Sequence, residues 1–349
     1  MTKNNLKTIL VLFVIVLIFT LAGCANISIK TDLGGFYKSA DSGKAWLKEK
    51  AVLNTLEKQE FLENVEVNVF TIDPQDSRTF YIGTKEKGLF FSYDSGKNWH
   101  KVKRLPKGEI TAITVNPVKK HVVYVGVGKT LYKTADALRT WDPVYVDDKK
   151  SNDKIVEVFV DSLYPNRVYA GFSDGRVIKS KNEGTSWSLL KDFYGSIVKI
   201  YTPVTSNKIF IATSREDLLY SDKDQKEWNE VESLEKKLDK KIKEVYFKED
   251  KFILVLTKES ILKSQDGGET WTKLDLLLPS GHRDKSEIRV AGFSNSNTDI
   301  LYYATGNTLY KSRNGGEDWI TRDLDVDGLP VNIFVHPKDP DILYLATTK

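Results

Sequence analysis

Seven copies of one eight-residue phrase, each closed by a tryptophan, run through this chain. The phrase reads Ser/Thr-x-Asp-x-Gly-x-x-Trp, as in SYDSGKNW at 92–99 and SQDGGETW at 264–271. Successive tryptophans stand 41 to 53 residues apart. A period in the forties is typical of an array of small units that each bury an apolar face against the next unit. Every tryptophan of the chain closes one copy: Trp46, Trp99, Trp141, Trp187, Trp228, Trp271 and Trp319.

Short apolar segments rich in β-branched and aromatic residues accompany each phrase. In the repeat that ends at Trp141 they read ITAITVNP (110–117), VVYVGV (122–127) and LYKT (131–134), with Asp, Asn, Gly and Pro between segments in most repeats. A further short segment follows each tryptophan, such as WHKV at 99–102. Such runs between turn residues predict strands. Four antiparallel strands per repeat predict the blade of a β-propeller.

The two ends of the repeat region are complementary. Residues 34–52 supply only a third strand, a phrase and a fourth strand, whereas residues 331–349 supply only the first two strands. Together they complete one blade beside six whole repeats. We therefore predict an all-β, seven-bladed propeller of four-stranded antiparallel blades over residues 34–349, closed by pairing of the N-terminal and C-terminal strands. Closure removes two exposed strand edges, so we expect a monomer.

The phrase has the residues of a structural turn. Its Asp or Asn accepts hydrogen bonds from backbone N–H groups, its Gly permits positive φ, and its Trp packs beside the turn. A ligand site on each copy is the alternative, but seven copies of one catalytic residue would be unusual. The third copy has Leu138 in place of Gly, and the fifth has Lys223 and Gln225 in place of Asp and Gly, so we expect looser or differently shaped turns there. The structural residues predicted besides the tryptophans are Asp41, Asp94, Asp136, Asn182, Asp266 and Asn314.

The phrase resembles the Asp-box, or BNR repeat, of sialidases and related propellers. The adjoining strands, such as GLFFSYDSGKNW and NTLYKSRNGGEDW, resemble those of the photosystem II assembly and stability factors, the xyloglucanase-type glycoside hydrolases and the sortilin-type receptors. The likeness covers residues 34 to 349. It implies the propeller fold, and by analogy of fold alone a role in assembling a membrane complex.

The first residues are typical of a bacterial lipoprotein signal. MTKNNLK is followed by the uncharged run TILVLFVIVLIFTLAG and by Cys24, the chain's single cysteine. The LAGC sequence resembles a lipobox, which implies cleavage before Cys24 and lipidation of its thiol. We predict a signal peptide at 1–23, a tether at 24–33 and an extracytoplasmic, membrane-anchored protein. The alternative is an uncleaved membrane helix, for which the apolar run is short.

Charge and motifs exclude several functions. Without Lys3 and Lys7 the formal net charge falls from +4 to +2, which leaves no electrostatic signature of nucleic-acid binding. The four histidines have no metal-ligand spacing, and we expect no metal and no cofactor. No Arg-Ile-Pro sequence of the sialidase type occurs. If the chain is an enzyme, it is a glycoside hydrolase with two facing carboxylates, but no pair of acids stands out.

Binding of a protein partner therefore fits the sequence better than catalysis, with a glycan as the alternative ligand. The predicted surface is the end of the ring that carries the loops between second and third strands. The connections 47–64, 142–154 and 275–287 are longer than the others and add to it. A mixed-charge rim without a dedicated anion site is the simpler interpretation of these loops. The candidate residues are Lys85, Lys87, Lys129, Arg176, Arg215, Lys258, His282 and Arg283.

Overall fold

The computed structural model describes residues 34–49, 65–149, 152–215, 218–222, 225–235, 241–279 and 287–348. The chain divides into two compact units, residues 1–32 and 33–349, and every described residue belongs to the second. The predicted signal peptide, the tether and Cys24 lie outside the described residues. Within the described ranges, no helix has the length and apolarity that a membrane span requires.

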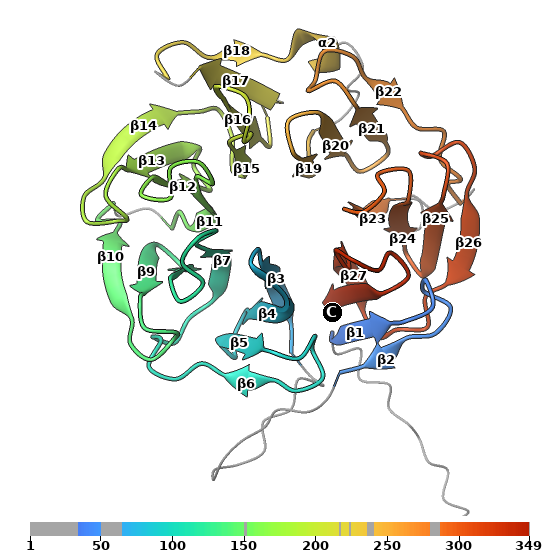
Figure 1. Cartoon of the computed structure of the whole chain (residues 1–349), viewed down its shortest axis with the longest axis horizontal. Coiled ribbons are helices and arrows are strands. Elements are labelled where there is room, and N and C mark those ends of the chain that lie inside the picture. The colour runs from blue at the N-terminus through green and yellow to red at the C-terminus, as the bar shows by residue number, and fades with distance from the viewer. Residues whose placement is uncertain are drawn as a thin grey trace, which may run out of the picture. The chain divides into compact units, whose positions relative to one another are not determined.

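Seven four-stranded antiparallel sheets stand around a ring, as the prediction required (Figure 1). Blades 1 to 6 each use four consecutive strands, and blade 7 combines strands from both ends of the chain. The single short helix, α2 (Glu232–Glu235), follows blade 4 in the described chain. The strands of blades 1 to 3 are β3 (Val67–Asp73), β4 (Asp76–Thr84), β5 (Leu89–Ser92), β6 (His100–Lys101), β7 (Ile110–Val115), β8 (Val123–Val127), β9 (Thr130–Thr134), β10 (Asp142–Val146), β11 (Ile155–Val160), β12 (Val168–Phe172), β13 (Arg176–Ser180) and β14 (Ser188–Asp192).

The strands of blades 4 to 6 are β15 (Ile197–Tyr201), β16 (Lys208–Thr213), β17 (Leu218–Asp222), β18 (Asn229–Glu230), β19 (Glu244–Lys248), β20 (Phe252–Leu256), β21 (Ile261–Ser264), β22 (Thr272–Lys273), β23 (Ile288–Phe293), β24 (Leu301–Thr305), β25 (Thr308–Ser312) and β26 (Ile320–Asp323). In each blade the first strand faces the axis and the fourth lies outside (Figure 1). We call the end with the phrases and the first-to-second strand loops the box end. The opposite end, with the second-to-third strand loops, is the rim end.

Blade 7 joins the two ends of the described chain. It contains β27 (Leu329–Val335), β28 (Leu343–Thr348), β1 (Phe36–Ser39) and β2 (Leu47–Lys48), in the spatial order β2-β1-β28-β27. β1 and β28 pair antiparallel with Phe36 opposite Ala346. The predicted closure of the ring by its termini is therefore confirmed.

Burial within a blade follows the position of the strand. Every residue of the second strands β12, β20 and β24 is buried, because neighbouring blades cover both faces of the sheet. The outer strand β14 is mostly exposed. Close approach of blades also selects small residues: a Cβ on Gly171 would stand 2.6 Å from Cγ2 of Ile197 on the next blade. Continuous apolar runs in second strands thus reflect two-sided burial rather than one solvated face.

An aromatic cluster fills the junction between blade 7 and blade 1. The Phe36 ring meets Trp99 edge-on at 5.3 Å, and Phe80 meets Tyr344 edge-on at 4.7 Å. All four side chains are at most 1% exposed. Phe36 and Tyr344 come from opposite ends of the chain, so this part of the core forms only when the ring closes.

Candidate functional site

The repeated phrase, here called the box, is a hydrogen-bonded turn. In the box at 92–99, Ser92 Oγ donates to Asp94 Oδ1 at 2.8 Å and accepts from the Gly96 N–H at 3.0 Å. The same carboxylate accepts the Asn98 N–H at 2.9 Å. The polar groups that a ligand would need are thus used inside the turn itself.

The third box departs from our expectation of a looser turn. Leu138 takes the place of Gly with φ 70°, and its N–H donates to Thr134 Oγ1 at 3.1 Å as the glycine N–H does elsewhere. Asp136 Oδ1 accepts the Thr140 N–H at 2.9 Å. That expectation is wrong, because the hydrogen bonds offset the strain of a left-handed leucine. In the fifth box Gln225 also has positive φ, but its N–H donates to Asp222 O at 2.9 Å, so that turn is built differently.

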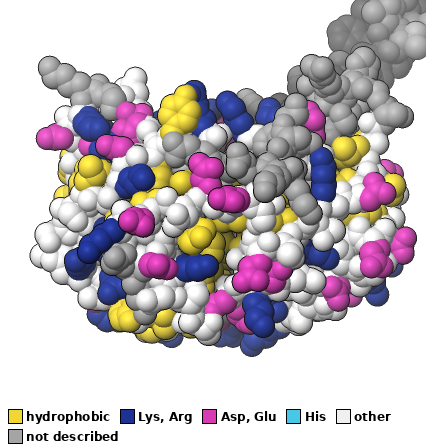
Figure 2. Space-filling view, turned by 90° about the horizontal axis from the view of Figure 1, so that it is seen from above, with side chains coloured by type: hydrophobic (Ala, Val, Ile, Leu, Met, Phe, Trp, Pro, Cys, Tyr) yellow, Lys and Arg dark blue, Asp and Glu magenta, His cyan; other side chains and the backbone are white. Residues whose placement is uncertain are grey.

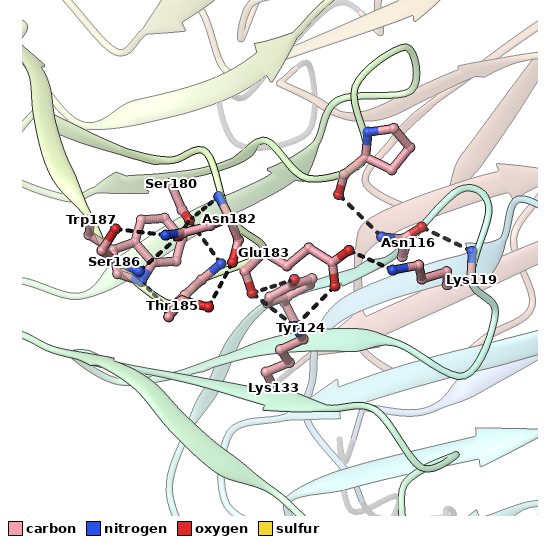
Figure 3. A network of polar contacts seen from close by, with 12 residues as sticks. Asn116, Lys119, Tyr124, Lys133, Ser180, Asn182, Glu183, Thr185, Ser186 and Trp187 are labelled. Atoms are coloured by element: carbon pink, nitrogen blue, oxygen red, sulfur yellow. Dashed lines mark hydrogen bonds and ion pairs between the residues drawn. The ribbon is translucent and has the colours of Figure 1, made fainter.

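Boxes also clamp neighbouring blades, as Figure 3 shows for blades 2 and 3. Lys133 Nζ and the Tyr124 hydroxyl both donate to the Glu183 carbonyl at 2.9 Å. Glu183 lies in the blade-3 box and forms an ion pair with Lys119 at 2.6 Å. In the same way Lys311 of blade 6 reaches Ser42 Oγ in the blade-7 box at 2.6 Å. The boxes therefore contribute to the joints of the ring.

We expect the box carboxylate to be replaceable by an amide but not by a methyl group. Partial burial raises the pKa of Asp266, but hydrogen bonds from Thr270 and Ser264 outweigh it and lower the pKa to about 2. Asp266→Ala loses these bonds and about 1 kcal/mol of unfolding free energy. Asp266→Asn should be near neutral, because Asn182 and Asn314 already accept the same backbone N–H groups.

The pH dependence of Asp266 has a definite sign. Its folded pKa lies below the unfolded value, so its stabilisation is present above pH 4 and is lost as the pH falls through about 2. Urea unfolding of wild type and both variants at pH 7 and pH 2.5 measures this. A wild-type advantage over Asp266→Ala that grows at pH 2.5 would contradict the account.

The predicted rim residues share one end of the ring, but several have acidic partners. Lys85 Nζ lies 3.3 Å from a Glu66 carboxylate oxygen, and Lys258 Nζ lies 3.7 Å from Glu287. Lys129 Nζ donates to the Lys149 carbonyl at 3.3 Å. These contacts match the simpler interpretation of a mixed-charge rim rather than a ring of available positive charge.

Arg176 is a correction to the predicted binding surface. Its side chain is 7% exposed and forms a bidentate pair with Asp147, at 3.1 and 2.7 Å. Its Nε donates to Asp174 at 2.6 Å, and its guanidinium stacks 4.4 Å from the Phe172 ring centroid. Hydrogen bonding to Arg176 lowers the pKa of Asp147, so the carboxylate is ionised at neutral pH. This buried cluster is structural and is closed to a partner.

The other predicted rim residues are spread around the ring. The guanidinium of exposed Arg215 stacks on the Tyr194 ring and donates to its hydroxyl at 2.6 Å, while Lys87 is exposed. His282 and Arg283 lie outside the described residues. Of the longer connections, 142–154 contains the outer strand β10 and delivers Asp147 to the buried cluster. Figure 2, seen from the upper edge of Figure 1, shows basic and acidic side chains interspersed.

A cavity of about 1120 Å³ opens around the ring axis at the box end. Its wall includes the aromatic side chains Phe70, Tyr246 and Phe334. The charged residues that line it are Asp73, Asp76, Arg78, Lys199, Glu244 and Lys338. No pattern in the sequence marked this cavity, because its wall combines first strands that are dozens of residues apart. Concave sites of roughly this size that combine aromatic and polar side chains are where ligands bind most often.

Two of the charged residues of the cavity, Lys199 and Glu244, come from the adjacent blades 4 and 5. Lys199 on β15 lies 3.0 Å from a carboxylate oxygen of Glu157 on β11. Burial lowers the pKa of Lys199, but Glu157 outweighs burial and the pKa is raised overall. Burial raises the pKa of Glu244 on β19. In the described parts of the chain, no group of three or more His, Cys, Asp and Glu side chains is placed to hold a metal ion.

Comparison with models of protein families identifies the family of the chain. The family model described as photosynthesis system II assembly factor YCF48 matches residues 39–335, from the first box to the end of β27. The chain belongs to the YCF48 family. A search of curated proteins finds no match. The YCF48 match covers the boxes and the first strands together, in agreement with the resemblance seen in the sequence.

Solved structures share the fold of this YCF48-family chain. A GH74 xyloglucanase from Xanthomonas campestris has a TM-score of 0.68 at 13% identity, over 90% of this chain and 52% of that one. "YCF48 bound to D1 peptide" has a TM-score of 0.60 at 15% identity, over 82% and 94%. YCF48 from Cyanidioschyzon merolae has 0.58 at 15%, over 81% and 95%. This chain spans about half the length of the xyloglucanase.

Proposed function

We propose that this chain is a membrane-anchored, extracytoplasmic propeller that binds a protein partner and assists the assembly of a membrane complex without catalysing a reaction. The observation that carries the proposal is the YCF48-family match over residues 39–335. The structure of a YCF48 protein with a D1 peptide adds support, because it shows that a propeller of this family accommodates a peptide.

The structure is consistent with a scaffold in two respects. The box hydrogen bonds are consumed within the turns and at the blade joints, which leaves a rigid ring. The loops of both ends are then held on fixed strands, which is how rigid scaffolds present binding residues. The partner is then recognised by these loops and by the axial cavity.

Affinity capture tests the proposed partner. The full chain, tagged at its C-terminus, is isolated from its native membranes, and bound proteins are identified by mass spectrometry. We expect subunits of a defined membrane complex at constant ratios. A protein of unrelated fold that carries the same tag serves as the control. Recovery of the same proteins with both baits, or of none, would contradict an assembly role.

Membrane attachment is tested separately through Cys24. The LAGC sequence supports lipidation of the Cys24 thiol, and serine cannot form the thioether. Cys24→Ser should abolish metabolic labelling with a radioactive fatty acid and leave the chain unprocessed at this site. Ser28→Ala, a small change within the predicted tether, is the matched control and should be labelled as the wild type is. Undiminished labelling of Cys24→Ser would rule out this anchor.

A glycoside hydrolase is the second candidate function. The axial cavity favours it, because aromatic walls suit sugar rings and the raised pKa of Glu244 suits a general acid. The test is release of reducing ends from a polysaccharide panel by wild type and Glu244→Gln. Activity that is lost in the variant supports catalysis, and the absence of activity in both supports the scaffold.

A further inference from the structure

The loops between first and second strands divide the box end into two unlike sectors. Those of blades 2, 3 and 4, counted with Lys208 at the start of β16, carry four cations and one acid, a net charge of +3. Those of the remaining four blades, residues 74–75, 249–251, 294–300 and 336–342, carry two cations and five acids, a net charge of −3. We call the first group, residues 116–122, 161–167 and 202–208, the loop-tip sector. A charge difference of this size across one face orients a charged partner.

Exposed apolar side chains lie in the same three loops as the positive charge. Each of the three loops presents at least one: Val118 is 58% exposed, Leu163 42% and Val204 47%. The loops are contiguous, since Asn116 Nδ2 donates to the Pro165 carbonyl at 3.4 Å across the blade boundary (Figure 3). The loop-tip sector therefore combines apolar contacts with cations, the composition that fits an acidic and apolar ligand surface.

A small pocket between the loops of blades 3 and 4 supplies a specific polar contact. Arg167, Thr202 and Lys208 are among the residues that line this cavity of about 20 Å³. Thr202 is 8% exposed, and its hydroxyl has no hydrogen-bond partner among the described residues. The neighbouring Asp161 carboxylate is occupied by the N–H groups of Leu163 and Tyr164. This volume holds about one water molecule, so a ligand carboxylate meets the two cations, Arg167 and Lys208, at the mouth of the pocket.

The position of the sector favours a protein over a lipid surface. The described chain begins at Gly34 beside Thr347, at the rim end, because β28 runs away from the box end to Thr348. Ten tether residues reach at most about 35 Å. The chain therefore enters the ring at the rim end, opposite the loop-tip sector.

We propose that the loop-tip sector binds an acidic, apolar segment of a partner protein, with one side-chain carboxylate beside Arg167 and Lys208 at the mouth of this pocket. The inference rests on the proposed function and adds the partner's chemistry to it. The carboxylate accepts hydrogen bonds from the guanidinium and the ammonium. Apolar side chains on either side of it contact Leu163 and Val204.

Fluorescence anisotropy with two labelled, C-terminally amidated peptides tests the proposal on the full chain. The probes are EVEGLEVEGLE and its glutamine counterpart QVQGLQVQGLQ. We expect the glutamate peptide to bind about tenfold more tightly, since charge-assisted hydrogen bonds are the strong ones. Arg167→Gln with Lys208→Gln should remove this preference. Lys251→Gln with Lys338→Gln, in the other sector, should leave it unchanged.

Two competitors distinguish a protein carboxylate from a lipid headgroup or free phosphate as the ligand. Phosphatidylcholine vesicles with 30% phosphatidylglycerol, or inorganic phosphate at matched ionic strength, should not displace the bound peptide. The proposal would be overturned by equal affinity of the wild type for both peptides or by displacement of the peptide by vesicles or phosphate. It would also be overturned if Lys251→Gln with Lys338→Gln removed the preference for the glutamate peptide. Such a failure is distinct from failed capture of membrane subunits, which bears on the proposed function itself.

Discussion

Deletion of residues 331–349 should abolish the folded monomer. The truncation removes β28 and most of β27, and with them the partner strand of β1. Phe36, Phe70 and Phe80 lose their ring contacts with Tyr344, and loss of a single buried aromatic side chain costs about 3–5 kcal/mol. Several such losses approach the whole unfolding free energy of a domain, about 5–15 kcal/mol. The open strand edges left behind favour association with other copies.

Size-exclusion chromatography with light scattering and thermal circular dichroism measure this outcome. Tyr344→Phe is the matched control, since it keeps the ring of the aromatic cluster and loses only the hydroxyl contact with the Ser95 carbonyl at 3.3 Å. We expect the control to remain a folded monomer and the truncation to aggregate or lack a cooperative transition. A truncated chain that stays monomeric with unchanged melting would show that the ring does not need its shared blade.

Replacement of Arg176 by methionine should cost about 3–5 kcal/mol of unfolding free energy, because it leaves buried Asp147 without its cation. The matched control is Arg215→Met, which removes an exposed guanidinium stacked on Tyr194 in the connection before β15 and should cost less than about 1 kcal/mol. Urea unfolding at pH 7 measures both. Equal costs for the two variants would contradict the structural role of the buried cluster.

The Arg176 effect should depend on pH with a defined sign. Hydrogen bonding to Arg176 lowers the pKa of Asp147 in the folded state. The stabilisation is therefore complete above the unfolded pKa near 4 and is lost as the pH falls through the depressed folded value. The difference between wild type and Arg176→Met should shrink at acid pH. The pair Arg176→Met with Asp147→Leu should recover part of the loss, because it leaves no unpaired buried charge.

The fold was predictable because its information is local and repeated. The spacing of the tryptophans specifies one blade per phrase, and residues 34–52 and 331–349 carry complementary halves of a blade. Strand order and closure of the ring follow from these two observations. The pairing of Phe36 with Ala346 in the structure agrees with both. The turn of the third box was harder to foresee, since Leu138 accepts a left-handed conformation that the pattern reserves for glycine.

The surface was less predictable because it sums contributions from residues far apart in the chain. Arg176 begins β13, directly after a loop of the kind that carries the exposed rim lysines, and only folding brings Asp147 against it. The loop-tip sector combines loops that begin more than 40 residues apart, each ordinary on its own. The axial cavity likewise takes Lys199 and Glu244 from separate blades. One repeat seen alone contains none of these features.

Zero-length cross-linking of the captured complex tests the central claim, that this ring is a protein-binding scaffold, most directly. A carboxylate-activating reagent couples lysine amines to acids in direct contact, and mass spectrometry reads both partners. The account predicts links from Lys119, Lys120 and Lys208 of the loop-tip sector to acidic residues of a membrane-complex subunit. The absence of links to another protein would contradict the central claim. Links confined to the rim lysines Lys87, Lys129 and Lys258 would contradict the loop-tip sector as the binding surface.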